Sequence, residues 1–432
     1  MGVTLFWFRR DLRLEDNHGL YQALKTSKKV RPLFIFDSHI LNKLPQQDAR
    51  VEYILNALGN LNDAMKKNRC CIGMYHGEPK AILNKLIENE KIERVVANHD
   101  YEPYARERDQ EIKSFLKTKG VRFETYKDQV IFEKGEVVKN DSTPYKVYTP
   151  YSRRWIERWG NEPPLSFPSE NLLHHLESNE TQPQKSLSDL GFKKSNIKLP
   201  TFITDERIMD EYEATRNYPA LDSTSRVGTA LRFGTISIRK LAMKAAKRSE
   251  ITYFKELIWR EFFMQILWHF PHTVERSFKP QYDRIEWRNN EDEFARWCAG
   301  ETGYPFVDAG MKELNATGFM HNRVRMLVGS FLCKHLLIDW RWGEAYFAKK
   351  LMDFEKSSNV GNWQWVAGCG VDAAPYFRIF NPTDQIKKFD KQHDYLKKWV
   401  PNYQELDYPQ PLVDHKRARE RCLATYKAAL NA

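Results

Sequence analysis

The first 128 residues alternate short apolar runs with amphipathic stretches, and this alternation limits the possible fold more than any other feature of the sequence. A chain that passes repeatedly from strand to helix to strand builds a parallel sheet with helices on both faces. The predicted strands are Val3 to Phe8, Val30 to Phe36, Cys70 to Tyr75, Arg94 to Asn98 and Val121 to Tyr126. The predicted helices are Asn17 to Lys25, Ala49 to Lys66, Glu78 to Glu90 and Tyr104 to Lys119.

The expected sheet is Rossmann-like, but it lacks the phosphate-binding loops of nucleotide-binding sheets. Neither GxGxxG nor GxxxxGK[ST] follows the first strand, and such glycine-rich loops bring backbone N–H groups to a phosphate. Any phosphate-containing ligand is therefore expected elsewhere in the chain.

Prolines, together with Ser and Asn, interrupt both periodicities from Asp141 to about Leu199, which is typical of a long surface connector. From Thr204 to the end the pattern is helical, with dense Trp, Tyr and Phe. We therefore expect an α/β domain over residues 1–130, a connector over 131–199 and an all-helical domain over 200–432.

Composition narrows the class of protein. The longest apolar runs are of strand length, far below the roughly 20 residues of a membrane-spanning helix, and the first residues do not resemble a secretory signal. Six cysteines occur without CxxC pairs or zinc-like spacing, so we expect reduced thiols, no metal site and a cytoplasmic protein. The formal charge of +11 favours a polyanionic partner, although many basic proteins bind none.

The segment KELIWREFF places Glu256, Trp259, Arg260 and Phe263 on one side of a predicted helix. A carboxylate, an indole and a guanidinium on one face can form an aromatic wall that also offers hydrogen bonds. Taken alone, the segment is better explained by an amphipathic helix with a core Trp and solvated charges.

The segment MHNRVRM places Asn322, Arg325 and Met326 on one helical face, with Arg323 beside them. Asn and Arg bind base edges, phosphates and flavin heteroatoms through paired hydrogen bonds. Alone the segment fits an exposed basic turn of helix, whereas together with KELIWREFF it indicates a pocket.

A third feature is the tract from Arg226 to Arg248, which holds seven Lys or Arg and no acid. The hydroxyls of the preceding Thr224 and Ser225 suit a phosphate at a helix start, and the later charges suit a DNA backbone. A solvated basic face is the commoner explanation of such a run.

These segments resemble the signatures of the photolyase and cryptochrome family, and most closely those of the microbial class I cyclobutane pyrimidine dimer DNA photolyases. The resemblance runs in order from FWFRRDLRLEDN to YPQPLVDHKRARERCLATYKAA and covers nearly the whole chain. The segments that carry it are Glu256 to Phe263, Trp287, Thr302 to Asp308, Met320 to Met326, Ile338 to Arg341 and Gly361 to Pro382. It implies a helical FAD-binding domain and light-dependent DNA repair.

The resemblance implies that the helical domain binds FAD in a bent conformation. The matching positions are Tyr212, Thr224, Ser225, Arg226, Val227, Gly228, Trp259, Asn322, Arg325, Asp353, Phe354, Glu355 and Asn359. Residues 224–228 are expected under the phosphates, and Asn359 at flavin N5, where photolyases keep Asn while plant cryptochromes carry Asp and animal ones Cys. The loop DFEKSSNVGN departs from the Gly and Ala of many microbial relatives, so Glu355 is a weaker candidate ligand than Asp353.

The resemblance also implies a set of residues for the damaged bases. The matching positions are Arg216, Glu256, Trp259, Arg260, Phe263, Asn322, Arg323, Met326 and Trp365. Trp259 and Trp365 are expected to form an aromatic wedge, because indole faces stack on bases for about 1 to 3 kcal/mol each. Glu256 is expected to hydrogen-bond the pyrimidine edge, and a lesion that stacks badly is cheaper to flip out.

The catalytic residues implied by the resemblance are Glu256, Asn359 and a chain of three tryptophans. Trp363 would lie nearest the flavin, followed by Trp340 and then Trp287 at the surface, although ordinary packing would otherwise explain three Trp among twelve. Reduced, anionic FAD would absorb blue or near-ultraviolet light and pass an electron to the dimer, whose two ring bonds open before the electron returns. Arg325 close to Asp353 would stabilise the anionic flavin.

An antenna chromophore is the least defined expectation. Folate-binding relatives carry an Asn-Glu pair after the fourth strand, where this chain has Tyr104 and Ala105, which argues against folate. Arg50, Asp100 and Glu102 are candidates for holding a deazaflavin or a second flavin, and an empty pocket is the alternative.

Two rival functions remain. One is a cryptochrome-type blue-light photoreceptor that signals through a protein partner, and the other is a six-four photolyase, whose paired histidines contrast with His321 followed by Asn322 here. Asn359 favours repair. We therefore expect a monomer that acts on DNA containing pyrimidine dimers and associates with the nucleoid when bound.

Overall fold

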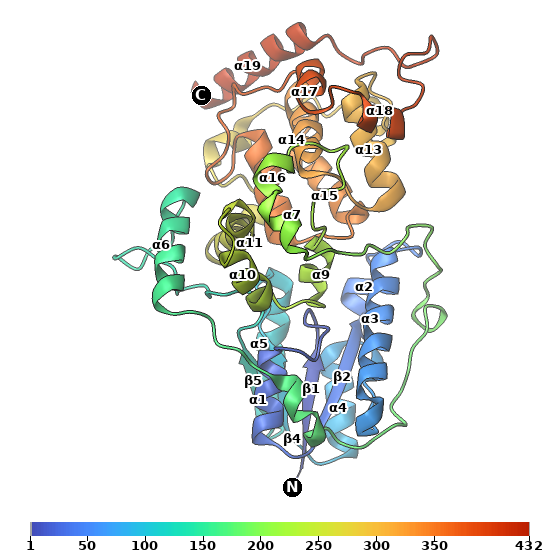
Figure 1. Cartoon of the computed structure of the whole chain (residues 1–432), viewed down its shortest axis with the longest axis vertical. Helices are drawn as coiled ribbons and strands as arrows, with labels where there is room; N and C mark the ends of the chain where they lie inside the picture. The colour runs from blue at the N-terminus through green and yellow to red at the C-terminus, as the bar shows by residue number, and fades with distance from the viewer. Residues whose placement is uncertain (1, 432) are drawn as a thin grey trace. The chain divides into compact units, whose positions relative to one another are not determined.

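The computed structural model describes residues 2–431, and the chain forms two compact units (Figure 1). The sheet unit consists of the residues up to Glu136, of Trp155–Phe202 and of Val227–Lys247. The helical unit consists of Val137–Arg154, Ile203–Arg226 and the chain from Arg248 onward. Each unit is therefore assembled from segments far apart in the sequence.

A five-stranded parallel sheet in the order β3-β2-β1-β4-β5 forms the centre of the sheet unit. Its strands are β1 (Val3–Phe8), β2 (Val30–Asp37), β3 (Gly73–Gly77), β4 (Ile92–Asn98) and β5 (Arg122–Tyr126). All five predicted strands are present, and β3 is displaced most, by two to three residues towards the C-terminus.

Helices cover both faces of this sheet because neighbouring residues of each strand point to opposite sides. Phe6 and Phe8 of β1 belong to one buried apolar cluster, whereas Leu5 and Trp7 belong to another. The helices of the sheet unit are α1 (His18–Thr26), α2 (Ser38–Leu41), α3 (Ala49–Met65), α4 (Pro79–Asn89), α5 (Pro103–Thr118), α9 (Gly228–Phe233) and α10 (Ile238–Ala246). The short helices η1 (Lys66–Asn68), η2 (Ser169–His175) and η3 (Ser188–Leu190) complete it.

The N-terminus of α1 lies where Rossmann-like sheets bind a phosphate, but side chains of the sheet unit already bond its N–H groups. Leu20 N–H donates to Asn17 Oδ1 at 3.1 Å, and Gly19 N–H donates to Asn98 Oδ1 at 2.8 Å. Asn98, which ends β4, donates in turn to Asp11 at 2.6 Å. The protein thus satisfies this helix end itself, which explains why the glycine-rich loop is missing.

A buried ion-pair cluster anchors α10 within the sheet unit. Asp128 lies 2.8 Å from Arg13 and 2.9 Å from Arg239, and Arg239 also lies 2.9 Å from Asp16. Burial disfavours the charged carboxylate of Asp128, yet the two guanidinium groups outweigh it and lower the pKa of Asp128. Arg239 of the basic tract is therefore part of the interior.

Within residues 2–431, the helical unit is built from eleven α-helices around one apolar core. They are α7 (Glu206–Asp210), α8 (Tyr212–Thr215), α11 (Thr252–His269), α12 (Glu291–Ala299), α13 (Pro305–Thr317), α14 (Asn322–Ser330), α15 (Trp340–Lys350), α16 (Lys356–Ala367), α17 (Pro382–Phe389), α18 (Asp394–Trp399) and α19 (His415–Asn431). Two 3-10 helices, η4 (Pro271–Val274) and η5 (Pro280–Arg284), and a π-helical turn, η6 (Phe331–His335), join them. With this unit, the predicted fold class of a parallel α/β sheet followed by a helical domain is confirmed.

The predicted connector contains one long helix, α6 (Tyr148–Asn161), which the sequence analysis did not predict. Its residues belong to both units. Pro150 falls in its first turn, where a missing N–H costs nothing. Among residues 2–431 no helix is both long and apolar enough to cross a membrane.

Close packing of α15 on α16 fixes the aromatic ring of Trp363. A Cβ added at Gly343 of α15 would overlap this ring and would also meet Leu332 at 2.7 Å. Trp363 is 3% exposed. Glycine at 343 therefore lets the edge of the indole's six-membered ring approach the backbone of α15 closely.

Candidate functional site

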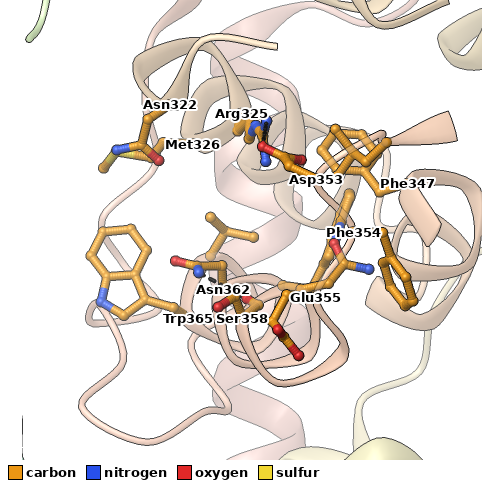
Figure 2. A pocket seen from close by; sticks show the side chains of 15 residues that line it. Asn322, Arg325, Met326, Phe347, Asp353, Phe354, Glu355, Ser358, Asn362 and Trp365 are labelled. Atoms are coloured by element: carbon orange, nitrogen blue, oxygen red, sulfur yellow. Dashed lines mark hydrogen bonds and ion pairs between the residues drawn. The ribbon is translucent and has the colours of Figure 1, made fainter. Parts of the chain in front are cut away.

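Two cavities with a common wall lie in the helical unit. The first measures about 110 Å³ and is drawn in Figure 2. It is lined by Asn322, Arg325, Met326, Gly329, Phe347, Leu351, Asp353, Phe354, Glu355, Ser358, Asn359, Asn362, Trp363, Trp365 and Val366. Apolar side chains with a few convergent polar groups are typical of a cofactor site.

The start of α14 presents the motif residues to this cavity. His321 precedes the helix and its Nδ1 accepts a hydrogen bond from the Arg323 N–H at 3.2 Å. Asn322, Arg325 and Met326 then share one face and all line the cavity, as their spacing predicts. Arg323 lines neither cavity. Its guanidinium bonds Asn217 and lies 4.5 Å above the Phe389 ring.

His321 is buried and surrounded by positive charge. Burial lowers its pKa to about 4, and the nearby Arg325 and Arg323 act in the same direction. Because Nδ1 accepts a hydrogen bond, the neutral ring carries its proton on Nε2. The start of α14 therefore depends on a neutral histidine.

Arg325 and Asp353 form an ion pair at the cavity wall, with Arg325 Nη2 2.8 Å from Asp353 Oδ2. Arg325 Nε also donates to Met320 O at 2.6 Å. The other carboxylate oxygen, Asp353 Oδ1, is buried and has no hydrogen-bond partner among residues 2–431. A buried acceptor without a partner costs about 1 to 3 kcal/mol, so this oxygen is suited to a ligand that donates an N–H or O–H.

Asn359 is held in one orientation by a residue that the sequence analysis missed. Its Nδ2 donates to Glu344 O at 3.1 Å and to Glu344 Oε1 at 2.9 Å. The oxygen Oδ1 is thereby left available as an acceptor, on a residue that lines the cavity. The donors of a flavin ring and its ribityl chain match Asp353 Oδ1 and Asn359 Oδ1, and the apolar walls match its flat rings, so these residues fit FAD.

The second cavity measures about 340 Å³ and adjoins the first. Its lining is Arg216, Glu256, Trp259, Arg260, Phe263, Asn322, Met326, Ser358, Asn362 and Trp365. Eight of the nine predicted lesion-binding positions are in this set, and Arg323 is the exception. Ser358 and Asn362 were not predicted. The two cavities share Asn322, Met326, Ser358, Asn362 and Trp365.

Glu256 and Arg216 form the charged part of the second cavity, at a separation of 2.7 Å. Both side chains are partly exposed. Burial raises the pKa of Glu256, and the Arg216 guanidinium offsets this only in part. Arg216 also lies 5.1 Å above the Tyr212 ring. The cavity thus offers a carboxylate and a guanidinium side by side.

Trp259 of α11 is backed by an aromatic residue outside its own helix. Tyr148 stacks on the indole with ring centroids 3.6 Å apart and an angle of 7° between the planes. The hydroxyl of Tyr148 donates to Lys255 O at 2.8 Å, which fixes the phenol. One face of Trp259 is therefore covered by protein, and the ring is held rigid at the cavity wall. Trp259 lines the second cavity only.

The residues predicted under the FAD phosphates line neither cavity. Ser225 is buried, and its Oγ accepts a hydrogen bond from the Tyr253 hydroxyl at 2.9 Å. The ring of Tyr253 packs edge-on against Tyr212. Arg226 lies 4.8 Å above the Phe319 ring and pairs with Asp222 at 3.0 Å. Thr224, Ser225 and Arg226 belong to the helical unit, whereas Val227 and Gly228 belong to the sheet unit at the start of α9.

Most Lys and Arg side chains of the basic tract from Arg226 to Arg248 form ion pairs with acids that are distant in sequence. Arg232 lies 2.6 Å from Glu102, Lys240 pairs with Glu15, and Arg248 pairs with Glu206. The tract lacks acids of its own, but the fold supplies them. Its net charge is therefore a poor indicator of a DNA-binding face.

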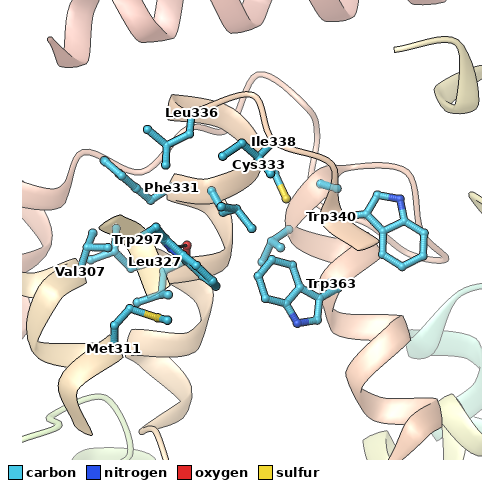
Figure 3. Close-up of a cluster of buried hydrophobic side chains, with 14 of the residues drawn as sticks. Trp297, Val307, Met311, Leu327, Phe331, Cys333, Leu336, Ile338, Trp340 and Trp363 are labelled. Atoms are coloured by element: carbon cyan, nitrogen blue, oxygen red, sulfur yellow. Dashed lines mark hydrogen bonds between the residues drawn. The ribbon is translucent and has the colours of Figure 1, made fainter. Parts of the chain in front are cut away.

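The three tryptophans of the predicted electron-transfer chain lie in or against the core of the helical unit. Trp363 lines the first cavity, Trp340 is 1% exposed, and Trp287 is only partly buried. Figure 3 labels Trp340 and Trp363 among the buried side chains of this core. Trp287 packs edge-on against Tyr426 at 6.0 Å. Trp363 and Trp340 are both buried and Trp287 alone of the three is partly exposed, which is what the surface end of such a path requires.

The candidate antenna residues of the sheet unit form ion pairs with other side chains of the protein. Arg50 pairs with Asp48 at 2.5 Å, and Asp100 and Glu102 lie 3.3 and 3.2 Å from Arg10. Burial alone would raise the pKa of Asp100, but Arg10 and its neighbours hold it at about 2. Tyr104, at one of the folate positions, donates to Asp37 at 2.6 Å. Nothing in these contacts marks a chromophore.

Comparison with known proteins identifies relatives over the whole chain. Residues 253–407 match the family model for the FAD binding domain of DNA photolyase, and residues 4–169 match the DNA photolyase model. The chain is 35% identical to a deoxyribodipyrimidine photo-lyase of Halobacterium salinarum, with 99% of each chain covered. It is 33% identical to that of Escherichia coli, again with 99% of each covered.

Solved structures of photolyases are also similar to this chain over its whole length. A bacterial class III photolyase from Agrobacterium tumefaciens is 33% identical, with a TM-score of 0.88, and the match covers 100% of this chain and 98% of that one. An archaeal photolyase from Sulfolobus tokodaii, solved with two FAD molecules, is 32% identical with a TM-score of 0.84, covering 99% and 100%.

Proposed function

Because the chain belongs to the DNA photolyase family, we propose that it repairs DNA as a deoxyribodipyrimidine photo-lyase, splitting cyclobutane pyrimidine dimers with light and FAD. The observation that carries the proposal is the pair of adjoining cavities. One is lined by residues that suit a flavin, the other is lined by stacking and hydrogen-bonding groups, and five residues form their common wall. Two ligands, one in each cavity, would be separated from each other only by these side chains.

Bound, reduced FAD supplies the light-excited electron that opens the dimer. The residues of the first cavity would hold and orient this group. Asp353 Oδ1 and Asn359 Oδ1 would accept hydrogen bonds from it, and Arg325 would place a positive charge on the cavity wall, which favours the anionic form. Glu344 keeps the Asn359 carboxamide oriented, and Trp363 forms part of the cavity wall.

The second cavity would receive the flipped-out lesion. Trp259 and Trp365 offer indole faces for stacking, and the rigid support of Trp259 by Tyr148 means that little is lost in ordering it. Glu256 hydrogen-bonds the pyrimidine edge, and its raised pKa suits a group that can hold a proton close to a base that gains negative charge. Arg216 keeps this carboxylate in place.

The remaining assignments are part of the same proposal. Trp363, Trp340 and Trp287 would return electrons to oxidised flavin. A second chromophore would harvest light, as the two FAD molecules of the Sulfolobus structure suggest for that protein. We assign the chain to class I on its signature segments. A sequence tree that groups it with class III members would contradict this.

One chain suffices for the site, because every lining residue of both cavities comes from the helical unit. We therefore propose a monomer that acts in the compartment holding the DNA, the cytoplasm and its nucleoid. We also keep 1–130, 131–199 and 200–432 as the functional domain limits.

The test is repair of an oligonucleotide that carries one thymine dimer. Purified protein with FAD absorbance, reduced and illuminated with blue light, is expected to restore the undamaged strand with turnover, and the dark sample serves as the control. Tight flavin binding without repair of this substrate would contradict the proposal and favour a photoreceptor.

A further inference from the structure

A polar strip on α16 faces both cavities. Ser358 and Asn362 are one helical turn apart, and each lines the first and the second cavity. Figure 2 shows them on the α16 side, opposite Asn322 and Met326 of α14. No part of the assignment above uses either residue. They lie at the boundary that separates the candidate flavin cavity from the candidate lesion cavity.

The carboxamide of Asn362 has a defined orientation and an unused acceptor. Its Nδ2 donates to Ser358 O at 2.8 Å. Because a carbonyl oxygen can only accept, this bond identifies which end of the amide is nitrogen. Oδ1 then has no hydrogen-bond partner within residues 2–431, and one N–H of Nδ2 also remains. The side chain is exposed, so the oxygen is accessible to a ligand.

The neighbouring polar groups do not compete for the same role. Glu256 and Arg216 are bound to each other at 2.7 Å, and they come from α11 and the segment after α8. Arg260 lies 3.9 Å from Glu355. Asn362 is therefore a neutral donor and acceptor pair on the wall formed by α16, and Glu256 is a carboxyl group from α11 that is already paired with Arg216.

Resting on the proposed function, we propose that Asn362 binds the hydrogen-bonding edge of one pyrimidine of the flipped dimer, with Oδ1 accepting from a ring or amino N–H. Thymine presents an N3–H beside a carbonyl, and cytosine presents an amino N–H beside a ring nitrogen. One carboxamide can satisfy either edge, since it both donates and accepts. Asn362 would therefore accept a thymine or a cytosine of the dimer without discriminating between the two. Reading a flipped base by this edge is a general way to recognise it.

The test measures dark binding, by fluorescence anisotropy, of flavin-loaded protein to three oligonucleotides: undamaged, carrying a thymine dimer, and carrying a thymine dimer methylated at N3. The methyl group removes the donor that Oδ1 would accept from. Asn362→Ala is expected to weaken binding of the unmodified dimer on the order of 3- to 10-fold, the worth of one hydrogen bond. Binding of the methylated dimer should change much less.

The matched control is Asn89→Ala, an exposed helical Asn in α4 of the sheet unit, which should leave all three affinities unchanged. An equal loss for both dimers in Asn362→Ala, or no loss for either, would overturn the role of Asn362. So would a shifted flavin spectrum without a change in lesion affinity, because the side chain would then serve the first cavity. Equal binding of damaged and undamaged DNA by the wild type would instead contradict the proposed function itself.

Discussion

Tyr148 and Trp259 stack almost parallel, with ring centroids 3.6 Å apart, although one lies in a segment predicted as connector and the other in the core helix α11. The stack converts an isolated indole into a two-layer aromatic wall. Trp259 cannot turn without losing this contact, and its free side is the one available to a base.

Removing the support of Trp259 should weaken lesion recognition. Tyr148→Leu is expected to reduce the preference for damaged over undamaged DNA about 3- to 10-fold, since an aromatic pair is worth about 0.5 to 1.5 kcal/mol. Tyr148→Phe keeps the stack and should cost less. Trp259→Ala should have a larger effect, about 10-fold or more. Binding titrations check this, and loss of flavin in any of the three would show that the residue is misplaced.

Neutralising Asp353 should loosen the flavin. Asp353→Asn breaks the ion pair with Arg325 and exchanges a charged acceptor for a neutral one, and hydrogen bonds to charged groups are worth about 1.5 to 3 kcal/mol. We expect FAD affinity to fall about 10- to 100-fold, measured by the fluorescence of released flavin. Asp394→Asn, on the surface of α18, is the control. Unchanged affinity would remove Asp353 from the binding site.

Changing the outermost tryptophan should separate photoreduction from repair. Trp287→Phe is expected to slow photoreduction of oxidised flavin severalfold or more, because phenylalanine is much harder to oxidise, while enzyme reduced beforehand repairs normally. Trp399→Phe provides a partly buried comparison. A photoreduction rate equal to that of the wild type would exclude Trp287 from the path.

Acid should destabilise the protein through His321. Its pKa of about 4 in the folded state lies below the ordinary value near 6.5, so the unfolded chain binds the proton first. The stability due to neutral His321 is complete above pH 6.5 and is lost as the pH falls from there towards 4. Between pH 7.5 and 5 the free energy of unfolding should drop by about 2 kcal/mol from this group.

His321→Asn should flatten that part of the pH profile, because Asn can still cap α14 but does not titrate. Urea unfolding at the two pH values compares the variant with the wild type. A drop of the same size in both would assign the effect to other histidines.

The sequence predicted the strands of the sheet and most of both cavities, because local periodicity and motif spacing carry that information. Asn322, Arg325 and Met326 share a face through helical spacing alone. Tyr148 and Glu344 were missed because their partners, Trp259 and Asn359, come from other elements, and no local pattern links them. Ser358 and Asn362 were noted only as differences from relatives. Whether their side chains face the cavities depends on how α16 is rotated against α14, which the sequence does not reveal.

The basic tract is a case in which the sequence was misleading. Counting charges along Arg226 to Arg248 suggested a polyanion, but Glu102, Glu15 and Glu206 neutralise members of it after folding. Charge along a chain and charge on a surface differ whenever tertiary contacts bring acids from elsewhere.

The overlap that any side chain at position 343 would create with Trp363 has a practical meaning for engineering. A methyl group there would displace the indole, which lines the first cavity, so even the smallest replacement should change the surroundings of a bound flavin as well as stability. Libraries aimed at spectral tuning can exploit this site deliberately, and libraries aimed at thermostability should leave it untouched.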